Sequence, residues 1–413
     1  MQLVVRNART GRSREPQDIG VDYGKITAVR PHLAATGDVE IDAGGRLVVP
    51  PFTNIHMHID KCLTGQWRKT WSEDGSPELI PNAAKVKARI KESEIQRNAS
   101  KVIQDSVAYG VLQLRAFCDV DSINRLKSIK ILLKLREEFK RSIRMQLVAF
   151  PQEGIIRDPD TKELLREALE LGADVVGGIP WLEKTKDAKE GHIDIVFQLA
   201  QEYNRDIHTL IDDNEDPSST CIEYLAKKTI RERFHGRVSA SHCRGRLSLS
   251  YDEYARRVFS LLKEARITVV ENPHISLLIY GRRAGYPKPR GITRVKELVE
   301  AGVNVAIGQD DIDDPYYPFG RGDMLELALF MAHAAHMSSP REIEDVMKMI
   351  TVNGARAMRE RGYGLDVGKD ASMVILNATT SHEALRRQSE RSHVIKDGRL
   401  VSEAATLTRQ YLS

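Results

Sequence analysis

The chain has 413 residues, of which 41% are hydrophobic and 29% charged, as is typical of a soluble globular protein with a substantial core. Its net charge of +4 is not concentrated in any Lys/Arg run, which argues against a nucleic-acid partner. No signal-peptide pattern, no run of about 18 apolar residues and no C-x-x-C pair is present, so we expect a cytoplasmic protein without disulfides or a membrane span.

Both ends of the chain carry short strand-like runs that Gly and Asp punctuate. These runs are Leu3–Arg6, Asp18–Val21, Lys25–Arg30 and Arg46–Pro50 near the N-terminus, and Ser372–Leu376 and His393–Val401 near the C-terminus. Little helix is predicted among them. We therefore expect the two groups to pair into one small sheet beside the main domain.

Between these ends, short apolar runs alternate with helical patterns such as Lys162–Leu171, Ile193–Tyr203 and Tyr251–Ala265. Strands that alternate with helices pair in parallel. Eight such units over about 300 residues predict a closed (β/α)₈ barrel, with an open doubly wound sheet as the alternative. The predicted strands are Thr53–His58, Val111–Arg115, Met145–Phe150, Asp174–Ile179, Asp206–Ile211, Arg237–His242, Ile267–Glu271 and Asn304–Gly308.

The first predicted barrel strand ends in two histidines, His56 and His58. Side chains two residues apart on a strand point to the same face, so both imidazoles can bind one metal ion. An H-x-H pair is a weak signal by itself. Its position strengthens it, because the chemistry of such barrels collects at the C-terminal ends of the strands.

Three further strands end in polar residues. Strand six ends at His242, for which a hydrogen-bonded core histidine is the alternative interpretation. Strand eight is followed by Asp310 and Asp311 without the D-x-D-x-D-G spacing of a calcium loop, which favours a metal ligand or a proton shuttle. Strand three is followed by Gln152, whose amide suits the recognition of a polar heterocycle.

Six segments along the chain carry a family resemblance, and they are Val49–His58, Phe150–Gly154, Val176–Pro180, Ser241–His242, Gly308–Gly320 and Gly364–Leu376. Their order and spacing resemble the amidohydrolase superfamily, in particular its cytosine deaminase and N-isopropylammelide hydrolase branch. The resemblance implies an α/β fold in which residues 51–360 form a distorted (β/α)₈ TIM barrel. It also implies a small β-sandwich domain that residues 1–50 and 361–413 form together.

The resemblance implies a site as well. It implies one divalent metal ion, Zn or Fe, that His56, His58 and Asp310 bind and that activates a water molecule. His242 matches a histidine that polarises the substrate or the water and acts as an acid or base in some members. The positions that match substrate contacts are Gln152, Asp311 and Tyr316.

The fifth predicted strand departs from the family pattern, which places a histidine ligand and a proton-shuttling glutamate there as H-x-x-E. Aligning the acidic turn and Pro217 puts Leu210 at the histidine position and Asp213 at the glutamate position. A second alignment makes His208 the metal ligand. Residues 208 and 210 lie about 6–7 Å apart on one face, so one metal ion cannot accept both positions equally. Asp212 is a further substitute for the missing ligand.

These features predict a metal-dependent hydrolase of non-peptide carbon–nitrogen bonds that releases ammonia or an alkylamine from a pyrimidine or s-triazine ring. The activated water attacks an sp² ring carbon, and Asp310, with Asp213 or His242, carries a proton to the departing amine. The alternatives are a hydrolase of cyclic or linear amides and a catalytically inactive paralogue that binds a ligand. The expected partner is a small N-heterocycle, and the family resemblance is compatible with a homo-oligomer.

Overall fold

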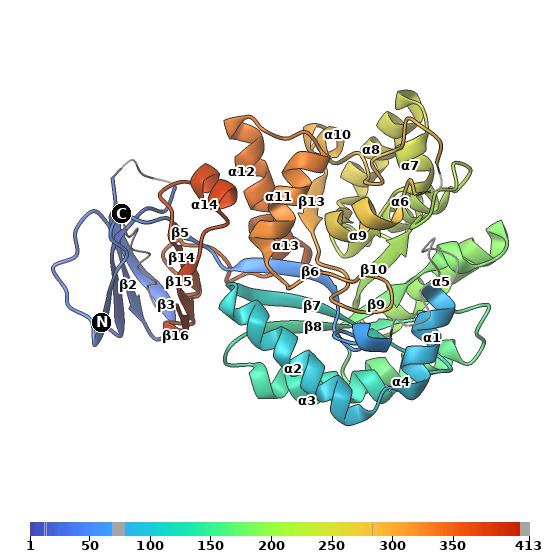
Figure 1. The fold of residues 1–413 in the computed structure, drawn as a ribbon, viewed down its shortest axis with the longest axis horizontal. Coiled ribbons are helices and arrows are strands. Elements are labelled where there is room, and N and C mark those ends of the chain that lie inside the picture. Colours follow the sequence, from blue (N-terminus) through green and yellow to red (C-terminus); the bar gives the residue numbers. More distant parts are fainter. Residues whose placement is uncertain (12, 14, 68–78, 283, 405–413) are drawn as a thin grey trace, which may run out of the picture.

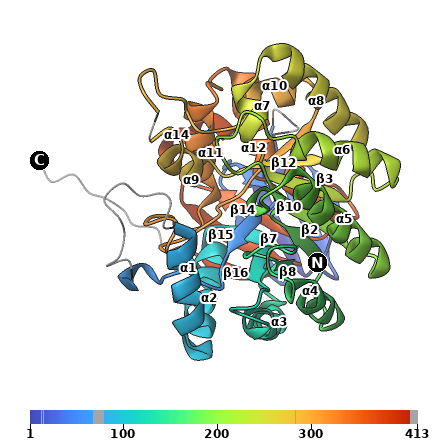
Figure 2. The same ribbon diagram turned by 90° about the vertical axis from the view of Figure 1, so that its right-hand side faces the viewer.

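The computed structural model describes residues 1–11, 13, 15–67, 79–282 and 284–404. Its main body is an eight-stranded sheet whose strands lie side by side in chain order, each parallel to its neighbours (Figures 1 and 2). The strands are β6 (Phe52–His58), β7 (Val111–Asp119), β8 (Arg144–Phe150), β9 (Val175–Gly178), β10 (Asp206–Ile211), β11 (Val238–His242), β12 (Thr268–Glu271) and β13 (Asn304–Ile307). All eight strands expected from the sequence are confirmed, and the open doubly wound alternative is wrong.

The barrel closes between its last and first strands, just beyond β13. Met57 and Asp310 form a parallel bridge, in which the Asp310 N–H donates to the His56 carbonyl at 2.8 Å and the His58 N–H donates to the Asp310 carbonyl at 2.8 Å. Gly308 makes this approach possible, because a Cβ atom there would lie 2.6 Å from His56 Cβ. The closure therefore brings the two predicted histidines next to the predicted aspartate.

Helices cover the outside of the barrel and alternate with its strands (Figure 2). They are α1 (Leu79–Arg89), α2 (Glu92–Ala108), α3 (Lys127–Phe139), α4 (Thr161–Glu170), α5 (Lys186–Glu202), α6 (Cys221–Arg231), α7 (Gly245–Leu249), α8 (Asp252–Ala265), α9 (Pro273–Ile279), α10 (Val295–Glu300), α11 (Met324–Ala334), α12 (Pro340–Met349) and α13 (Val352–Ala357). Helix α8 buries Ala255, Val258, Phe259 and Leu262, the spacing of a one-sided apolar stripe. Among the described residues, none of the helices has the length and apolar character needed to cross a membrane.

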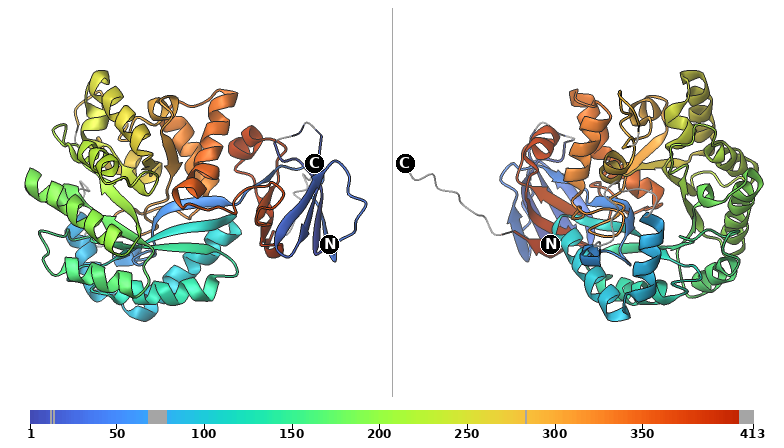
Figure 3. Two further views of the ribbon diagram at one scale, coloured as in Figure 1. Left: turned by 180° about the vertical axis from the view of Figure 1, so that it is seen from behind. Right: turned by 45° about the vertical axis from the view of Figure 1, so that its right-hand side comes forward.

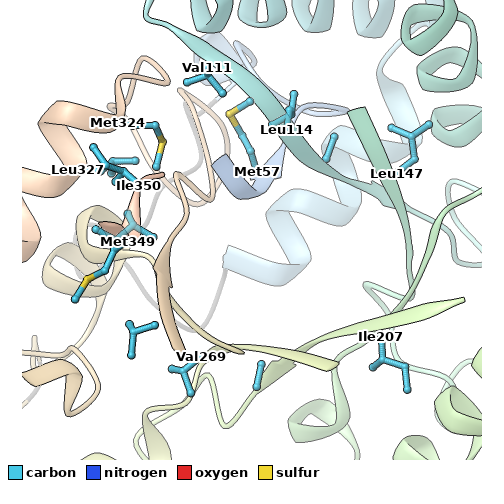
Figure 4. Packing of buried hydrophobic residues seen from close by; sticks show 14 of the residues in the cluster. Met57, Val111, Leu114, Leu147, Ile207, Val269, Met324, Leu327, Met349 and Ile350 are labelled. Atoms are coloured by element: carbon cyan, nitrogen blue, oxygen red, sulfur yellow. The ribbon is translucent and has the colours of Figure 1, made fainter. Parts of the chain in front are cut away.

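The main core fills the space between the strands and the surrounding helices. Strands β6 and β7 are buried along their whole length, as expected for parallel strands covered on both faces. Figure 4 shows side chains of this core, among them Met57, Leu114, Leu147, Ile207 and Val269 from five strands. This packing holds the strands that present the polar residues at their C-terminal ends.

The chain ends form two four-stranded sheets beside the barrel, so the expectation of one small sheet was wrong (Figure 3). The first contains β1 (Leu3–Ala8), β2 (Gln17–Asp22), β3 (Lys25–Arg30) and β4 (Val39–Asp42). The second contains β5 (Val48–Val49), β14 (Met373–Leu376), β15 (Arg391–Lys396) and β16 (Arg399–Glu403), with α14 (Ser381–Arg387) between β14 and β15. The two sheets share one buried apolar cluster, which makes them the implied β-sandwich.

The ranges 1–50 and 361–413 remain a prediction of where the small domain begins and ends. Residues 12, 14 and 405–413 of these ranges lie outside the described residues.

Candidate active site

The C-terminal ends of the barrel strands surround a cavity of about 260 Å³. Its polar lining consists of His58, Gln152, Asp213, Asn214, His242, Asp310, Asp311 and Tyr316. Its remaining lining consists of Ile179, Trp181, Leu210, Ile275, Ile279 and Tyr280. A largely apolar cavity with a few converging polar groups is the form that sites for small ligands take.

Three of the predicted metal ligands converge at one side of this cavity. His56 Nε2 lies 3.3 Å from His58 Nε2 and 3.3 Å from Asp310 Oδ1, and His58 Nε2 lies 3.5 Å from Asp310 Oδ1. All three residues are buried, and their ligand atoms form one of two groups of potential metal ligands among the described residues. Their positions follow from the H-x-H alternation on β6 and from the barrel closure at Asp310.

Two residues of the site, His242 and Asp310, have an unusual backbone conformation. His242 and Asp310 have φ values of 69° and 66°, in the left-handed region that residues other than glycine rarely adopt. Both stand where a strand gives way to a loop. Strain of this kind collects at functional sites, because it aims a side chain that a regular strand would point elsewhere.

The charges of the site suit metal binding. Burial lowers the pKa of His56, His58 and His242, so these imidazoles are neutral near pH 7. Burial opposes ionisation of Asp310, but the facing His56 and the neighbouring histidines outweigh it and hold its pKa below the usual range. Neutral imidazoles and an ionised carboxylate are the forms that bind a divalent cation.

His242 and Asp213 stand together on the other side of Asp310. His242 Nε2 lies 3.7 Å from Asp310 Oδ2, while His242 Nδ1 lies 3.3 Å from Asp213 Oδ1. The Tyr280 hydroxyl donates to Asp213 Oδ1 at 3.0 Å, and the Arg244 guanidinium pairs with the same carboxylate and lies over the Tyr280 ring. Asp213 is therefore held beside the imidazole by two neighbours.

The structure does not bring His208 into the group of converging ligand atoms. The Arg115 guanidinium lies 3.3 Å from His208 Nδ1, and His208 Nε2 lies 2.7 Å from Ser241 Oγ, which in turn lies 2.6 Å from His56 Nδ1. Because Arg115 can only donate, His208 Nδ1 accepts and Nε2 donates to Ser241. His208 thus contacts the candidate ligand His56 through a serine.

The alternative positions on the fifth strand have other surroundings. Leu210 lines the cavity and packs in an apolar cluster with Phe117 and Phe150. Asp212 is buried, and its carboxylate accepts hydrogen bonds from Ser219 Oγ and from the Ile222 N–H. Leu210 therefore presents an apolar side chain to the cavity, and the Asp212 carboxylate already has hydrogen-bond partners.

The predicted substrate contacts Gln152, Asp311 and Tyr316 all line the cavity. Asp311 Oδ1 and Tyr316 Oη are buried and have no hydrogen-bond partner among the described residues. Burial and the nearby Asp314 raise the pKa of Asp311 well above its usual value. Buried polar atoms are normally satisfied, so these two are available to a bound ligand.

Sequence reasoning assigned no role to Lys61 and Asn272. Lys61 Nζ lies 3.1 Å from His58 Nδ1 and occupies the second group of potential metal ligands, formed by His58, Asp60 and Asp119. Asn272 Nδ2 lies 3.2 Å from Asp310 Oδ2. Asn272 directly follows β12, so applying the strand-end rule to the seventh barrel strand would have found it, whereas strand alternation does not predict Lys61.

The residues present fit a catalytic divalent metal ion. Three buried ligand atoms converge beside an open cavity, which matches a site with three protein ligands and one position for water or substrate. Two imidazole nitrogens and a carboxylate oxygen suit Zn or Fe better than Mg or Ca, which prefer oxygen ligands.

Comparisons with known proteins agree with the fold. The profile described as the amidohydrolase family matches residues 85–402. N-isopropylammelide isopropyl amidohydrolase from Pseudomonas sp. (strain ADP) is 32% identical over 409 residues, 97% of this chain and 96% of that protein. Pterin deaminase from Rhizobium rhizogenes is 26% identical and covers 96% of this chain and 90% of its own length.

A solved structure is similar over the whole chain. The crystal structure of 5-methylcytosine deaminase from Klebsiella pneumoniae, liganded with phosphonocytosine, superposes with a TM-score of 0.93 at 33% identity. It covers 99% of this chain and 100% of its own.

Proposed function

Since the chain belongs to the amidohydrolase family and is a hydrolase of carbon–nitrogen bonds, we propose that it releases ammonia or an alkylamine from a pyrimidine or s-triazine ring. The observation that carries this proposal is the convergence of His56, His58 and Asp310 beside a cavity lined by Gln152 and Asp311. Similar proteins named for deamination of cytosine and pterin rings, and for hydrolysis of an ammelide, support it.

His56 Nε2, His58 Nε2 and Asp310 Oδ1 would hold one divalent ion, Zn or Fe. Such an ion supplies Lewis-acid activation of water near neutral pH. Asp310 Oδ2 stays free of this role and faces His242 Nε2 at 3.7 Å. We assign Asp310 Oδ2 to accept a proton from the attacking water and to return it to the amine nitrogen as the C–N bond breaks.

His242 and Asp213 support this transfer. Asp213 Oδ1 beside His242 Nδ1 favours the imidazole tautomer that carries its proton on Nδ1. His242 Nε2 then keeps a lone pair, 3.4 Å from Asn272 Nδ2 and 3.7 Å from Asp310 Oδ2, that can accept a proton or a hydrogen bond. The roles of Gln152, Asp311 and Tyr316 are to bind the ring through hydrogen bonds, since these polar residues line the same cavity as His242 and Asp213.

The apolar part of the cavity narrows the substrate class. Ile179, Trp181, Leu210, Ile275 and Ile279 line one cavity together. An apolar surface of this kind favours a ring that carries a methyl or alkylamino substituent over an unsubstituted ring, by about 0.8 kcal/mol per buried methylene. We therefore expect the preferred substrates to carry such a substituent.

The test combines metal content with amine release. Protein purified without chelator is analysed for metals, and ammonia and alkylamine release is followed on a panel of amino- and alkylamino-pyrimidines and s-triazines. We expect about one Zn or Fe per chain, release of an amine and an intact ring. His56→Asn should lose both metal and activity, whereas His192→Asn, at a buried histidine paired with Glu183, should keep both.

Other outcomes would replace the proposal. A carboxylate product with an opened chain would make the protein an amide hydrolase. A folded protein without metal that still binds the ring compounds would make it a ligand-binding paralogue, a reading that Leu210 at the position of the family's histidine would then explain.

A further inference from the structure

Lys61 lies in direct contact with one of the candidate metal ligands. Its ammonium nitrogen lies 3.1 Å from His58 Nδ1, 3.3 Å from Asp60 Oδ1 and 3.0 Å from Asp119 Oδ1. All four residues are buried. An ammonium group has three N–H donors and no acceptor, so these three partners match its full hydrogen-bonding capacity.

This contact determines the tautomer of His58. Because the ammonium of Lys61 can only donate, His58 Nδ1 must accept, and a neutral imidazole that accepts at Nδ1 carries its proton at Nε2. His58 Nε2 is the atom that faces His56 Nε2 and Asp310 Oδ1. A protonated Nε2 has no lone pair to give to a metal ion.

His56 Nδ1 has a different set of neighbours, a hydroxyl and the Asn272 amide nitrogen at 3.3 Å, and that amide also lies 3.2 Å from Asp310 Oδ2, to which it can donate instead. His56 Nδ1 lies 2.6 Å from Ser241 Oγ, and a hydroxyl can either donate or accept. Ser241 Oγ has two lone pairs, so it can accept from His56 Nδ1 and from His208 Nε2 at once. His56 can therefore take the tautomer that binds metal at Nε2, with Ser241 Oγ accepting from its Nδ1–H and Asn272 donating to Asp310 Oδ2.

The Asp119 carboxylate lies next to the Lys61 ammonium and close to the His58 ring. Asp119 Oδ1 lies 4.0 Å from His58 Nδ1, with Lys61 Nζ bonded to both atoms. A histidine that binds metal usually donates its other ring N–H to a carboxylate or carbonyl, which fixes the ring and strengthens the ligand. Asp119 has the chemistry for that role, and Lys61 stands between it and the ring.

We propose that Lys61 is a positioning residue that holds His58 in the tautomer with its proton on Nε2 and thereby weakens metal binding at His56, His58 and Asp310. Without the amine, Asp119 accepts from His58 Nδ1–H and the site binds metal more tightly. This inference rests on the metal centre of the proposed function, because it concerns the affinity of that centre. The two carboxylates also explain why a buried lysine stays charged: burial opposes its charge, but Asp119 and Asp60 raise the pKa of Lys61.

The test uses Lys61→Met, which keeps the length of the side chain and removes the donors. Zinc affinity is measured by competition with a chromophoric chelator, and the His58 tautomer is read from ¹⁵N chemical shifts of the imidazole nitrogens. We expect Lys61→Met to bind zinc about tenfold more tightly or better and to move the proton of His58 to Nδ1. Lys61→Arg, which is also a donor without an acceptor, should keep the wild-type tautomer and affinity.

Lys87→Met is the matched control. Lys87 is a second buried lysine, with its Nζ 3.6 Å from Asp119 Oδ2 and 2.6 Å from Asp121 Oδ2, so its loss also removes a cation beside Asp119. It should leave the His58 tautomer as it is. Equal or weaker zinc binding by folded Lys61→Met would overturn the proposal.

The wild-type spectrum gives an independent test that needs no variant. A His58 proton on Nδ1 in the zinc-free wild type would overturn the proposal even if Lys61→Met fails to fold. A wild type and a folded Lys61→Met that both lack any affinity for zinc would contradict the proposed function as well, while the tautomer would still be read from the spectrum.

Discussion

Asp213 Oδ1 lies 3.3 Å from Nδ1 of His242, while the other ring nitrogen of this histidine lies 3.7 Å from Asp310 Oδ2. The imidazole thus connects a carboxylate at the cavity wall with the carboxylate of the candidate metal centre. Histidines oriented by one carboxylate keep the opposite nitrogen free for proton transfer. In the sequence, Asp213 stands only as a shortened substitute for a glutamate, and in the structure its carboxylate lies beside His242 Nδ1, where we expect it to orient the imidazole.

Asp213→Asn should lower kcat about 10²- to 10⁴-fold, because an amide N–H facing His242 Nδ1 favours the opposite tautomer. Metal content should stay at the wild-type level, since Asp213 is outside the group of His56, His58 and Asp310. Steady-state kinetics and elemental analysis on one preparation check both. Asp213→Glu, which keeps the carboxylate, should retain more activity than Asp213→Asn, and the reverse order would rule out the orienting role.

His208→Gln should retain metal, whereas His56→Asn should lose it, because His208 contacts the centre only through Ser241. The cost of His208→Gln should appear in stability, since Arg115 loses a buried acceptor worth about 1–3 kcal/mol. Elemental analysis and urea unfolding of the two variants distinguish these effects. Loss of metal in His208→Gln would make His208 a ligand and would support the second alignment of the fifth strand.

Leu210→His should raise zinc affinity about tenfold, because it adds an imidazole to the wall of the cavity that His58 and Asp310 also line. Leu210→Met is the matched control, with similar volume and no imidazole. Chelator competition compares the two variants with the wild type. Unchanged affinity in Leu210→His would mean that the fifth strand lies too far from the metal centre to supply a ligand.

The raised pKa of Asp311 leads us to expect that the stability of the protein depends on pH. Burial and Asp314 raise the pKa of Asp311 in the folded chain above the unfolded value of about 3.9, so the folded state binds more protons above that pH. Stability from this group therefore falls as the pH rises from about 4 through the folded-state pKa. Asp311→Asn should make the free energy of unfolding less sensitive to pH above about pH 4, measured by urea denaturation.

The Asp311 experiment has a control of opposite sign. A hydrogen bond from Ser218 lowers the pKa of Asp216, so Asp216 contributes stability above about pH 4 that is lost on acidification. Asp216→Asn should therefore change the pH dependence of the free energy of unfolding in the opposite sense to Asp311→Asn. An identical pH slope in wild type and Asp311→Asn would show that Asp311 ionises normally.

Ile279→Ala should weaken discrimination between substituted and unsubstituted rings. Deleting three carbons from the cavity wall reduces the preference in kcat/KM for a methyl or isopropylamino ring about tenfold. The loss should lie mainly in KM, because the contact is made equally in the ground state and the transition state. Ile156→Ala, at a 41% exposed isoleucine that does not line the cavity, should leave the preference unchanged.

Much of the fold could be predicted because local pattern and global fold agree. The barrel strands are buried on both faces and read as apolar runs between amphipathic helices, so their number and order follow from the sequence. The strand pairing of the two terminal sheets was harder to predict from the sequence. Val48 and Val49 look like a continuation of the N-terminal strands, yet they pair with β14, a contact between distant parts of the chain that no local pattern reveals.

The sequence predicts the site residues that lie at the ends of strands. It does not predict those whose role depends on side-chain contacts formed in the folded chain. His56, His58, His242 and Asp310 follow from the strand-end rule. The strand-end rule does not decide whether residue 208 or residue 210 takes the position of the family's histidine ligand. Both side chains lie on one face of the strand, and only their depth along the barrel differs. The contact of Lys61 with His58 and Asp119 depends on the turn after β6, which alternation does not describe.

The pairing of β5 with β14 also bears on when the protein can become functional during its synthesis. Val49 pairs with Val374, and three residues after Val49 the chain enters β6 at Phe52, the strand that carries His56 and His58. On the ribosome these histidines emerge long before either β14 or Asp310. The segment that leads into β6 gains its pairing partner β14 only when the C-terminal part of the chain has been synthesised. We therefore expect metal to bind after translation rather than during it.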